Sequence, residues 1–192
     1  MMEELPWARI KTRGITLIQF KRYLSETAGE KAALEAISTL PEEQAQSIMN
    51  ARKGAWYPFE TQRLLREVII AAINPRDPSD VIYDMGLVTA SWDFSGFLSS
   101  LFSFISKETV LNHAATLWRK YYDRGKMSVV KFEENRSLIE LTDFPCDEHF
   151  PPVVSSWMKV AIETLKFRNP VVNTQADDTH KPPLFRFELF WE

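Results

Sequence analysis

The spacing of apolar residues changes near residue 125, and this change constrains the fold more than any other feature of the chain. Before it, apolar residues recur at helical spacing, most clearly over 61–73. After it, they gather in two short runs, 127–132 and 137–141, which four polar residues separate. The first spacing is typical of amphipathic helices, and the second of two strands in a hairpin. The sequence therefore predicts a helical N-terminal half followed by a sheet.

Short breaks divide the N-terminal half into a series of helices. Residues 7–18 favour an extended start with a break at Gly14, and Gly29 suits the end of the first helix. Pro41 suits the first turn of a later helix, because proline lacks the N–H that this position leaves unpaired. The predicted helices cover residues 20–28, 31–40, 41–52, 61–73, 80–90, 94–105 and 107–122.

The C-terminal part has the order β-β-α-β-β. A helix over 153–167 follows the first two strands, and further strands cover 171–175 and 184–191. Alternate residues point to opposite faces of a strand, so the last strand has one strongly apolar face. That face carries Phe185, Phe187, Leu189 and Trp191.

These elements together predict an α+β fold. A mainly helical part, residues 1–125, packs on a four-stranded and mainly antiparallel sheet formed within residues 126–192. With 192 residues and 45% hydrophobic content, the chain can bury a sizeable core. We therefore expect a single domain over residues 1–192.

Composition excludes several classes of function. Lysine and arginine total 23 against 26 aspartates and glutamates, so the net charge of -3 offers no basic surplus for nucleic acid. One cysteine excludes a disulfide framework. Polar residues interrupt the most apolar stretch, 86–105, whereas a membrane span needs about 20 predominantly apolar residues. The first residues show no signal-peptide core, so a cytoplasmic protein without membrane contact is expected.

Several short motifs recur in an order that is typical of a known superfamily. The chain resembles the heme–nitric-oxide-binding-like superfamily, which also contains the 4-vinyl-reductase-type ligand-binding domains. The resemblance covers nearly the whole chain and is closest to the myxobacterial-type branch. It rests on Gly14 to Gly29, Trp56-Tyr57-Pro58, Met85-Gly86, Trp118 to Gly125, Leu141 to Pro145, and Phe187 to Trp191.

The resemblance implies a place for heme, and the residues at that place differ from the heme-binding pattern. In the heme-binding branch a helical histidine ligates iron, and His113 falls where that ligand is expected. A Tyr-x-Ser-x-Arg motif holds the propionates there, whereas this chain has Thr142-Asp143-Phe144-Pro145-Cys146-Asp147. The carboxylates of Asp143 and Asp147 would repel propionates rather than pair with them. We therefore expect no cofactor, with heme bound through His113 as the alternative.

An aromatic-rich interior suggests a ligand pocket. His113 lies on the apolar face of its helix, where a core histidine with a hydrogen bond is the alternative to a ligand-binding role. The same residues would serve either a cavity or a filled core. The candidate ligand-binding residues are Phe97, Phe102, His113, Leu117, Trp118 and Tyr121.

Catalytic and metal-binding motifs are not found in the sequence. It has no glycine-rich phosphate loop and no Gly-x-Ser-x-Gly elbow. Cys146 and His149, with His180 in a later loop, do not complete a four-ligand metal site. The residues and the resemblance together predict a non-enzymatic bacterial sensor that binds a small apolar molecule and signals to a protein partner or as a homodimer. The alternatives are an interaction scaffold with a packed core and a heme-based gas sensor using His113.

Overall fold

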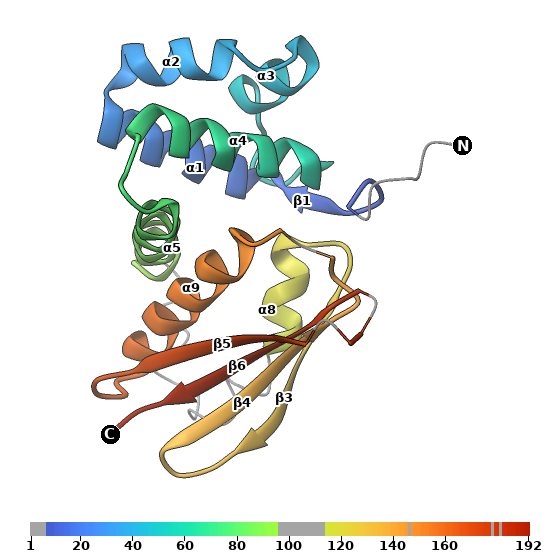
Figure 1. The fold of residues 1–192 in the computed structure, drawn as a ribbon, viewed down its shortest axis with the longest axis vertical. Helices are drawn as coiled ribbons and strands as arrows, with labels where there is room; N and C mark the ends of the chain where they lie inside the picture. Colours follow the sequence, from blue (N-terminus) through green and yellow to red (C-terminus); the bar gives the residue numbers. More distant parts are fainter. Residues whose placement is uncertain (1–6, 96–113, 146, 178, 181) are drawn as a thin grey trace.

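The computed structural model describes residues 7–95, 114–145, 147–177, 179–180 and 182–192 (Figure 1). Its N-terminal part is a group of helices beside a small sheet of two antiparallel strands, and its C-terminal part is a sheet with helices on one face (Figure 1). The elements of the first part are β1 (Lys11–Arg13), α1 (Gly14–Ala28), α2 (Glu30–Ser38), α3 (Glu42–Met49), β2 (Trp56–Pro58), α4 (Phe59–Ile73) and α5 (Pro78–Phe94). Those of the second are α8 (Ala114–Tyr121), β3 (Lys126–Phe132), β4 (Arg136–Thr142), α9 (Phe150–Thr164), β5 (Val171–Asp177) and β6 (Leu184–Phe190).

The larger sheet has the strand order β3-β4-β6-β5, and each neighbouring pair is antiparallel. Ile139 of β4 lies opposite Phe187 of β6, and both are buried on the face that α8 and α9 cover. The opposite face carries charged residues, including Arg186, which pairs with Glu140 and Asp177. This alternation confirms the predicted apolar face of the last strand.

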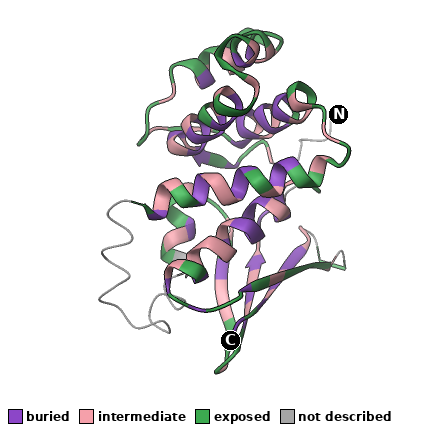
Figure 2. Cartoon of the chain, turned by 90° about the vertical axis from the view of Figure 1, so that its left-hand side faces the viewer, coloured by how far each residue is buried: buried purple, intermediate pink, exposed green. Residues whose placement is uncertain are grey.

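Buried residues form two clusters that meet at the boundary between the parts (Figure 2). One cluster lies among α1, α2, α4 and α5, and Val153 of α9 reaches into it. The other lies between the sheet and helices α8 and α9, and Ile10 and Phe59 reach into it from the N-terminal part. Apolar side chains therefore cross the boundary in both directions.

The structure confirms the predicted α+β fold, and all four strands of the larger sheet begin and end within two residues of their predicted bounds. The predicted extended segment 7–18 is wrong for its second half, because α1 begins at Gly14. Leu17 and Phe20 are buried at helical spacing against the other helices, so tertiary packing overrides the strand propensity of this stretch.

The predicted break between residues 90 and 94 is also wrong, since α5 continues to Phe94. The hydroxyl of Ser91 donates to the carbonyl of Leu87 within the helix at 2.8 Å, so this polar residue does not interrupt it. The remainder of the predicted helix 94–105, and residues 107–113 of the next one, lie outside the described residues. None of the described helices has both the length and the apolar character that a membrane span requires.

Helices α5 and α9 approach closely at a glycine. A Cβ atom added at Gly86 would lie 1.9 Å from Ser156 Oγ and 2.9 Å from the carbonyl oxygen of Val153. Both distances are far below ordinary contact, so only glycine fits this crossing. The glycine thus sets how near the N-terminal part lies to the sheet-bearing part.

The substitution Gly86→Ala tests this contact. In an unhindered helix the change would stabilise by about 1 kcal/mol. Here overpacking should instead lower the free energy of unfolding by about 1–3 kcal/mol. Gly54→Ala is the matched control, because nothing lies within 4 Å of its added Cβ atom. Urea denaturation of both variants measures the effect, and equal stabilities for the two would contradict the close crossing.

Candidate ligand-binding cavity

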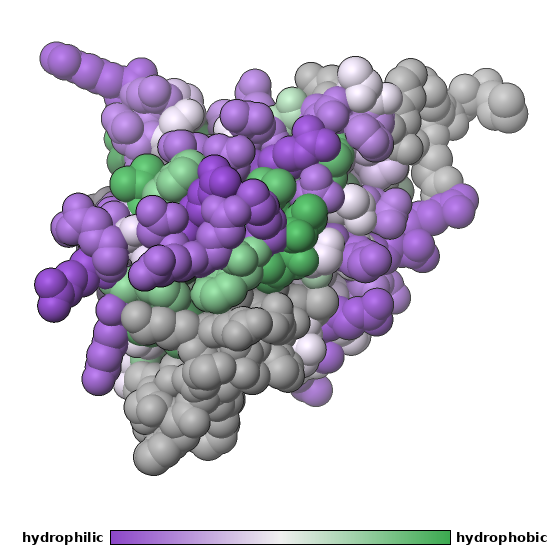
Figure 3. Space-filling model, turned by 90° about the horizontal axis from the view of Figure 1, so that it is seen from below, coloured by the Kyte–Doolittle hydropathy of each residue, from purple (hydrophilic) through white to green (hydrophobic). Residues whose placement is uncertain are grey.

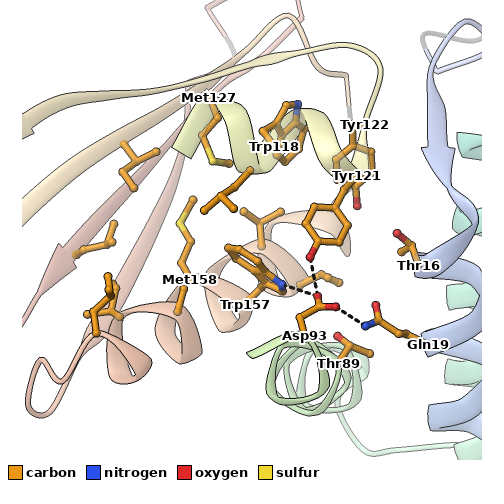
Figure 4. Close-up of a pocket in the computed structure, with 18 of the residues that line it drawn as sticks. Thr16, Gln19, Thr89, Asp93, Trp118, Tyr121, Tyr122, Met127, Trp157 and Met158 are labelled. Carbon is orange, nitrogen blue, oxygen red and sulfur yellow. Dashed lines mark hydrogen bonds between the residues drawn. The ribbon is translucent and has the colours of Figure 1, made fainter. Parts of the chain in front are cut away.

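A cavity of about 100 Å³ lies between the N-terminal helices and the sheet-bearing part (Figure 4). Its walls come from α1, α5, α8, α9 and the inner face of the sheet, and they are mainly apolar. The described lining residues are Thr16, Gln19, Phe20, Thr89, Asp93, Leu117, Trp118, Tyr121, Tyr122, Met127, Ile139, Val153, Val154, Trp157, Met158, Ala161, Ile162, Leu165 and Leu189.

Helical and strand periodicities explain how these side chains converge. On α8, Tyr121 follows Trp118 by three residues and Leu117 by four, so it lies on the same side of the helix as both. Helix α9 contributes a longer stripe that runs from Val153 to Leu165. Met127, Ile139 and Leu189 point inward from β3, β4 and β6. The cavity is thus a gap in a packed interface rather than an open loop region.

The carboxylate of Asp93 joins four helices at one side of the cavity (Figure 4). Gln19 Nε2 of α1 donates to Oδ1 at 2.7 Å. The Tyr121 hydroxyl of α8 and Trp157 Nε1 of α9 donate to Oδ2 at 2.8 and 3.2 Å. Hydrogen bonds to a carboxylate are stronger than those between neutral groups, so these three contacts hold the helices firmly. Asp93 of α5 therefore ties both parts of the chain together beside the cavity.

The Tyr121 hydroxyl is held in its protonated form. Burial raises the pKa of this phenol well above its usual range, and the nearby charge of Asp93 raises it further. Tyr121 therefore donates to Asp93 from a protonated hydroxyl. The donor cannot be lost by titration near neutral pH.

Three of the six residues predicted to contact a ligand line this cavity, namely Leu117, Trp118 and Tyr121. Phe97, Phe102 and His113 lie outside the described residues. The role of all six as ligand contacts stays a prediction. Sequence reasoning missed Gln19, Asp93 and Trp157. Asp93 was interpreted only as one of the polar residues that interrupt the apolar stretch 86–105.

Other aromatic residues fill the interior next to the cavity. The Phe144 ring stacks on that of Phe150 at 5.1 Å, and Phe59 meets both edge to face. Trp118 contacts Phe144 at 4.9 Å, so one indole ring borders both the cavity and this packed cluster. The aromatic residues thus serve both functions that the sequence left open, a cavity wall and a filled core.

Arg66 is buried beside the aromatic cluster, with 1% of its surface exposed. Its Nη2 donates to the carboxylate of Asp147. The rings of Phe59 and Phe150 lie 5.5 and 5.4 Å from its guanidinium carbon. Asp147 was expected to repel propionates from this segment, and the structure shows that Arg66 already balances its charge.

The histidines of the described part are not grouped with other metal ligands. The His149 ring lies 3.8 Å from Glu148, and that of His180 lies 3.5 Å from Asp177. Within the described residues no group of three or more histidine, cysteine, aspartate or glutamate side chains could hold a metal ion. Cys146 lies outside the described residues.

The fold is similar to those of several solved structures. A mutant of the Fe(II) unliganded H-NOX protein from K. algicida is similar with a TM-score of 0.71 and 14% identity, over 94% of this chain and 96% of that one. A mutant H-NOX from T. tengcongensis has a TM-score of 0.70 and 7% identity, over 94% and 97%. A third structure, which concerns heme redox potential and porphyrin distortion, has a TM-score of 0.66 and 7% identity, over 93% and 99%.

The chain has the H-NOX fold. No model of a known protein family matches the sequence, and no curated protein matches it either. At such low identity the similarity establishes the fold alone. It agrees with the predicted superfamily at that level, while the myxobacterial-type branch and the 4-vinyl-reductase-type likeness stay predictions.

The pH dependence of stability tests the environment of Tyr121. Its folded pKa is raised, so the phenol stabilises the fold fully below about pH 10, the ordinary tyrosine value. That contribution is lost as the pH rises further. Tyr121→Phe should therefore flatten the alkaline fall in the free energy of unfolding measured in urea.

At neutral pH the same variant should lose about 1–2 kcal/mol, because Asp93 loses a donor. Tyr23→Phe serves as a comparison, since burial also raises the pKa of Tyr23, whose hydroxyl donates to Asp84 at 2.7 Å. An unchanged alkaline slope in Tyr121→Phe would contradict the proposed environment of this phenol.

Proposed function

We propose that this chain is a non-enzymatic bacterial sensory module that binds a small, mainly apolar molecule in the cavity beside Asp93. The observation that carries the proposal is an apolar cavity built jointly by the N-terminal helices and the sheet-bearing part. Ligand cavities of proteins are typically apolar with a few convergent polar groups, and Asp93 with its donors supplies these. Under this function, residues 1–192 act as one cytoplasmic sensor domain.

The position of the cavity suggests how ligand binding could change the surface that a partner contacts. An occupant would contact α1 and α5 on one side and α8 and α9 on the other. The hydrogen bonds of Asp93 connect the same four helices. A ligand that fits one relative placement of these helices better than another shifts the population toward it. The surface seen by a protein partner, or by a second copy of the chain, would change accordingly.

Heme does not fit the described cavity. A volume of about 100 Å³ leaves room for about one small ring, and a porphyrin is several times larger than that. The described lining contains no lysine, arginine or histidine that could pair with propionates. The guanidinium of Arg66 is already paired with Asp147. No step of the proposed function is therefore assigned to heme.

Heme-based gas sensing is the second candidate, and the fold favours it. The similar solved structures include an Fe(II) H-NOX protein and a structure concerned with heme redox potential. His113, the residue expected to ligate iron, lies outside the described residues. The question is therefore decided by experiment on the full chain.

An interaction scaffold without a ligand would be expected to present an apolar surface. Figure 3 shows hydrophobic side chains interspersed with hydrophilic ones on the lower face of the molecule. Among the described residues, Val171 and Phe190 are exposed neighbours in the sheet register, and the other exposed large apolar residues are Leu34, Met49, Trp56, Val130 and Phe132. Such small exposed groups favour the ligand cavity over the scaffold as the main function.

Thermal unfolding in the presence of benzene tests the main proposal. Benzene should raise the Tm of the natural chain, because a ligand that binds only the folded state stabilises it. Ala161→Phe places a ring in the cavity wall and should abolish this rise. Ala71→Phe adds the same ring at an exposed position of α4 and should keep it. Absence of any benzene effect on the natural chain would argue against the cavity as a binding site.

A hemin titration separates the two candidate functions. After mixing with hemin and desalting, the natural chain should retain no Soret absorbance, because the described cavity is too small. A sharp Soret band that disappears in His113→Ala would instead establish the second candidate. The measurement is an ultraviolet–visible spectrum of both proteins at equal concentration.

A further inference from the structure

One hydroxyl in the cavity wall has no hydrogen-bond partner. Thr16 of α1 is 5% exposed, and its Oγ1 is buried without a partner. Figure 4 shows its side chain projecting from α1 on the side of the cavity where Tyr121 and Tyr122 lie. A buried hydroxyl without a partner destabilises the folded state, so its presence calls for an explanation.

The other polar groups of the described wall are satisfied within the protein. The Thr89 hydroxyl donates to the carbonyl of Met85 at 2.8 Å. Trp118 Nε1 donates to the carbonyl of Arg124 at 2.7 Å, while Tyr121 and Trp157 donate to Asp93. Among the described lining residues, Thr16 Oγ1 is thus the buried side-chain atom left for an occupant of the cavity.

We propose that Thr16 is a specificity residue, and that the occupant carries one hydroxyl or carbonyl group on an otherwise apolar body. This inference rests on the proposed function and narrows its ligand class. The hydroxyl of Thr16 can both donate and accept a hydrogen bond, so it can pair with either group. The volume of about 100 Å³ limits the body to the size of a small ring or a short chain, as in a phenol or a short-chain alcohol or ketone.

The charges of the cavity wall restrict the class of ligand further. The described wall has no cationic side chain, and its one carboxylate, that of Asp93, would repel a carboxylate ligand. Asp93 already accepts three hydrogen bonds from three helices. Its oxygens are therefore already engaged by the protein's own donors. An uncharged ligand fits these surroundings best, because burying an unpaired ion is costly.

The affinities of phenol and benzene for three proteins test the inference. The two probes differ by a single hydroxyl group. Thr16→Val keeps the shape of the side chain and removes its hydroxyl. It should weaken phenol binding by about three- to tenfold and leave benzene binding unchanged, which is the effect of one hydrogen bond. Isothermal titration or ligand-observed NMR gives the dissociation constants.

Thr12→Val is the matched control. Thr12 is fully buried in β1, and its Oγ1 also has no partner, but it does not line the cavity. It should therefore keep the ratio of phenol to benzene affinity found in the natural chain. Thermal unfolding without ligand verifies that both valine variants remain folded.

The outcomes distinguish this inference from the function on which it rests. If the natural chain binds neither benzene nor phenol, the proposed function fails. If it binds both and Thr16→Val leaves their ratio unchanged, the cavity binds ligands and the role of Thr16 is overturned. If Thr12→Val shifts the ratio as much as Thr16→Val does, the effect is not local to the cavity, and the role is overturned as well.

Discussion

The contact between α5 and α9 fixes the geometry on which the rest of the structure depends. Gly86 lets the two helices approach so closely that even a methyl group would collide with Ser156. Two turns further along α5, Asp93 accepts the indole N–H of Trp157 from the same partner helix. One small residue and one hydrogen bond thus set the crossing at two points. The cavity is lined by residues of both helices, so its shape depends on the same crossing.

Much of the fold follows from the sequence because its patterns are local. The alternating Phe185, Phe187 and Leu189 identify both the strand β6 and its buried face, and the structure confirms them. Gly29 ends α1 with a positive φ of 89°, as its position predicted. The prediction of an extended segment was wrong around Leu17. The strand-favouring residues there form a helix because they pack against other helices. Propensity loses to tertiary burial at such positions.

The cavity lining was only partly predictable, because some of its contacts join residues far apart in the sequence. Leu117, Trp118 and Tyr121 stand on an evident apolar helix face, so their inward direction could be expected. Asp93 carries no such signal, since a single carboxylate in an apolar helix looks like an interruption. Its role depends on donors that lie 64 and 74 residues away in the chain, Trp157 and Gln19. Pairings at that separation are a property of the folded topology, which periodicity does not encode.

The residues that the H-NOX fold requires differ from those that a heme site requires. The fold requires helices that bury one stripe and a sheet that buries one face, and apolar residues of many kinds satisfy that requirement. A heme site requires in addition a large void and cations at a defined place, whereas the described residues enclose a cavity of about 100 Å³ and a buried Arg66–Asp147 pair. Opening the interior further would break contacts such as Trp118 on Phe144. The same packing that stabilises the fold therefore limits the volume of the described cavity.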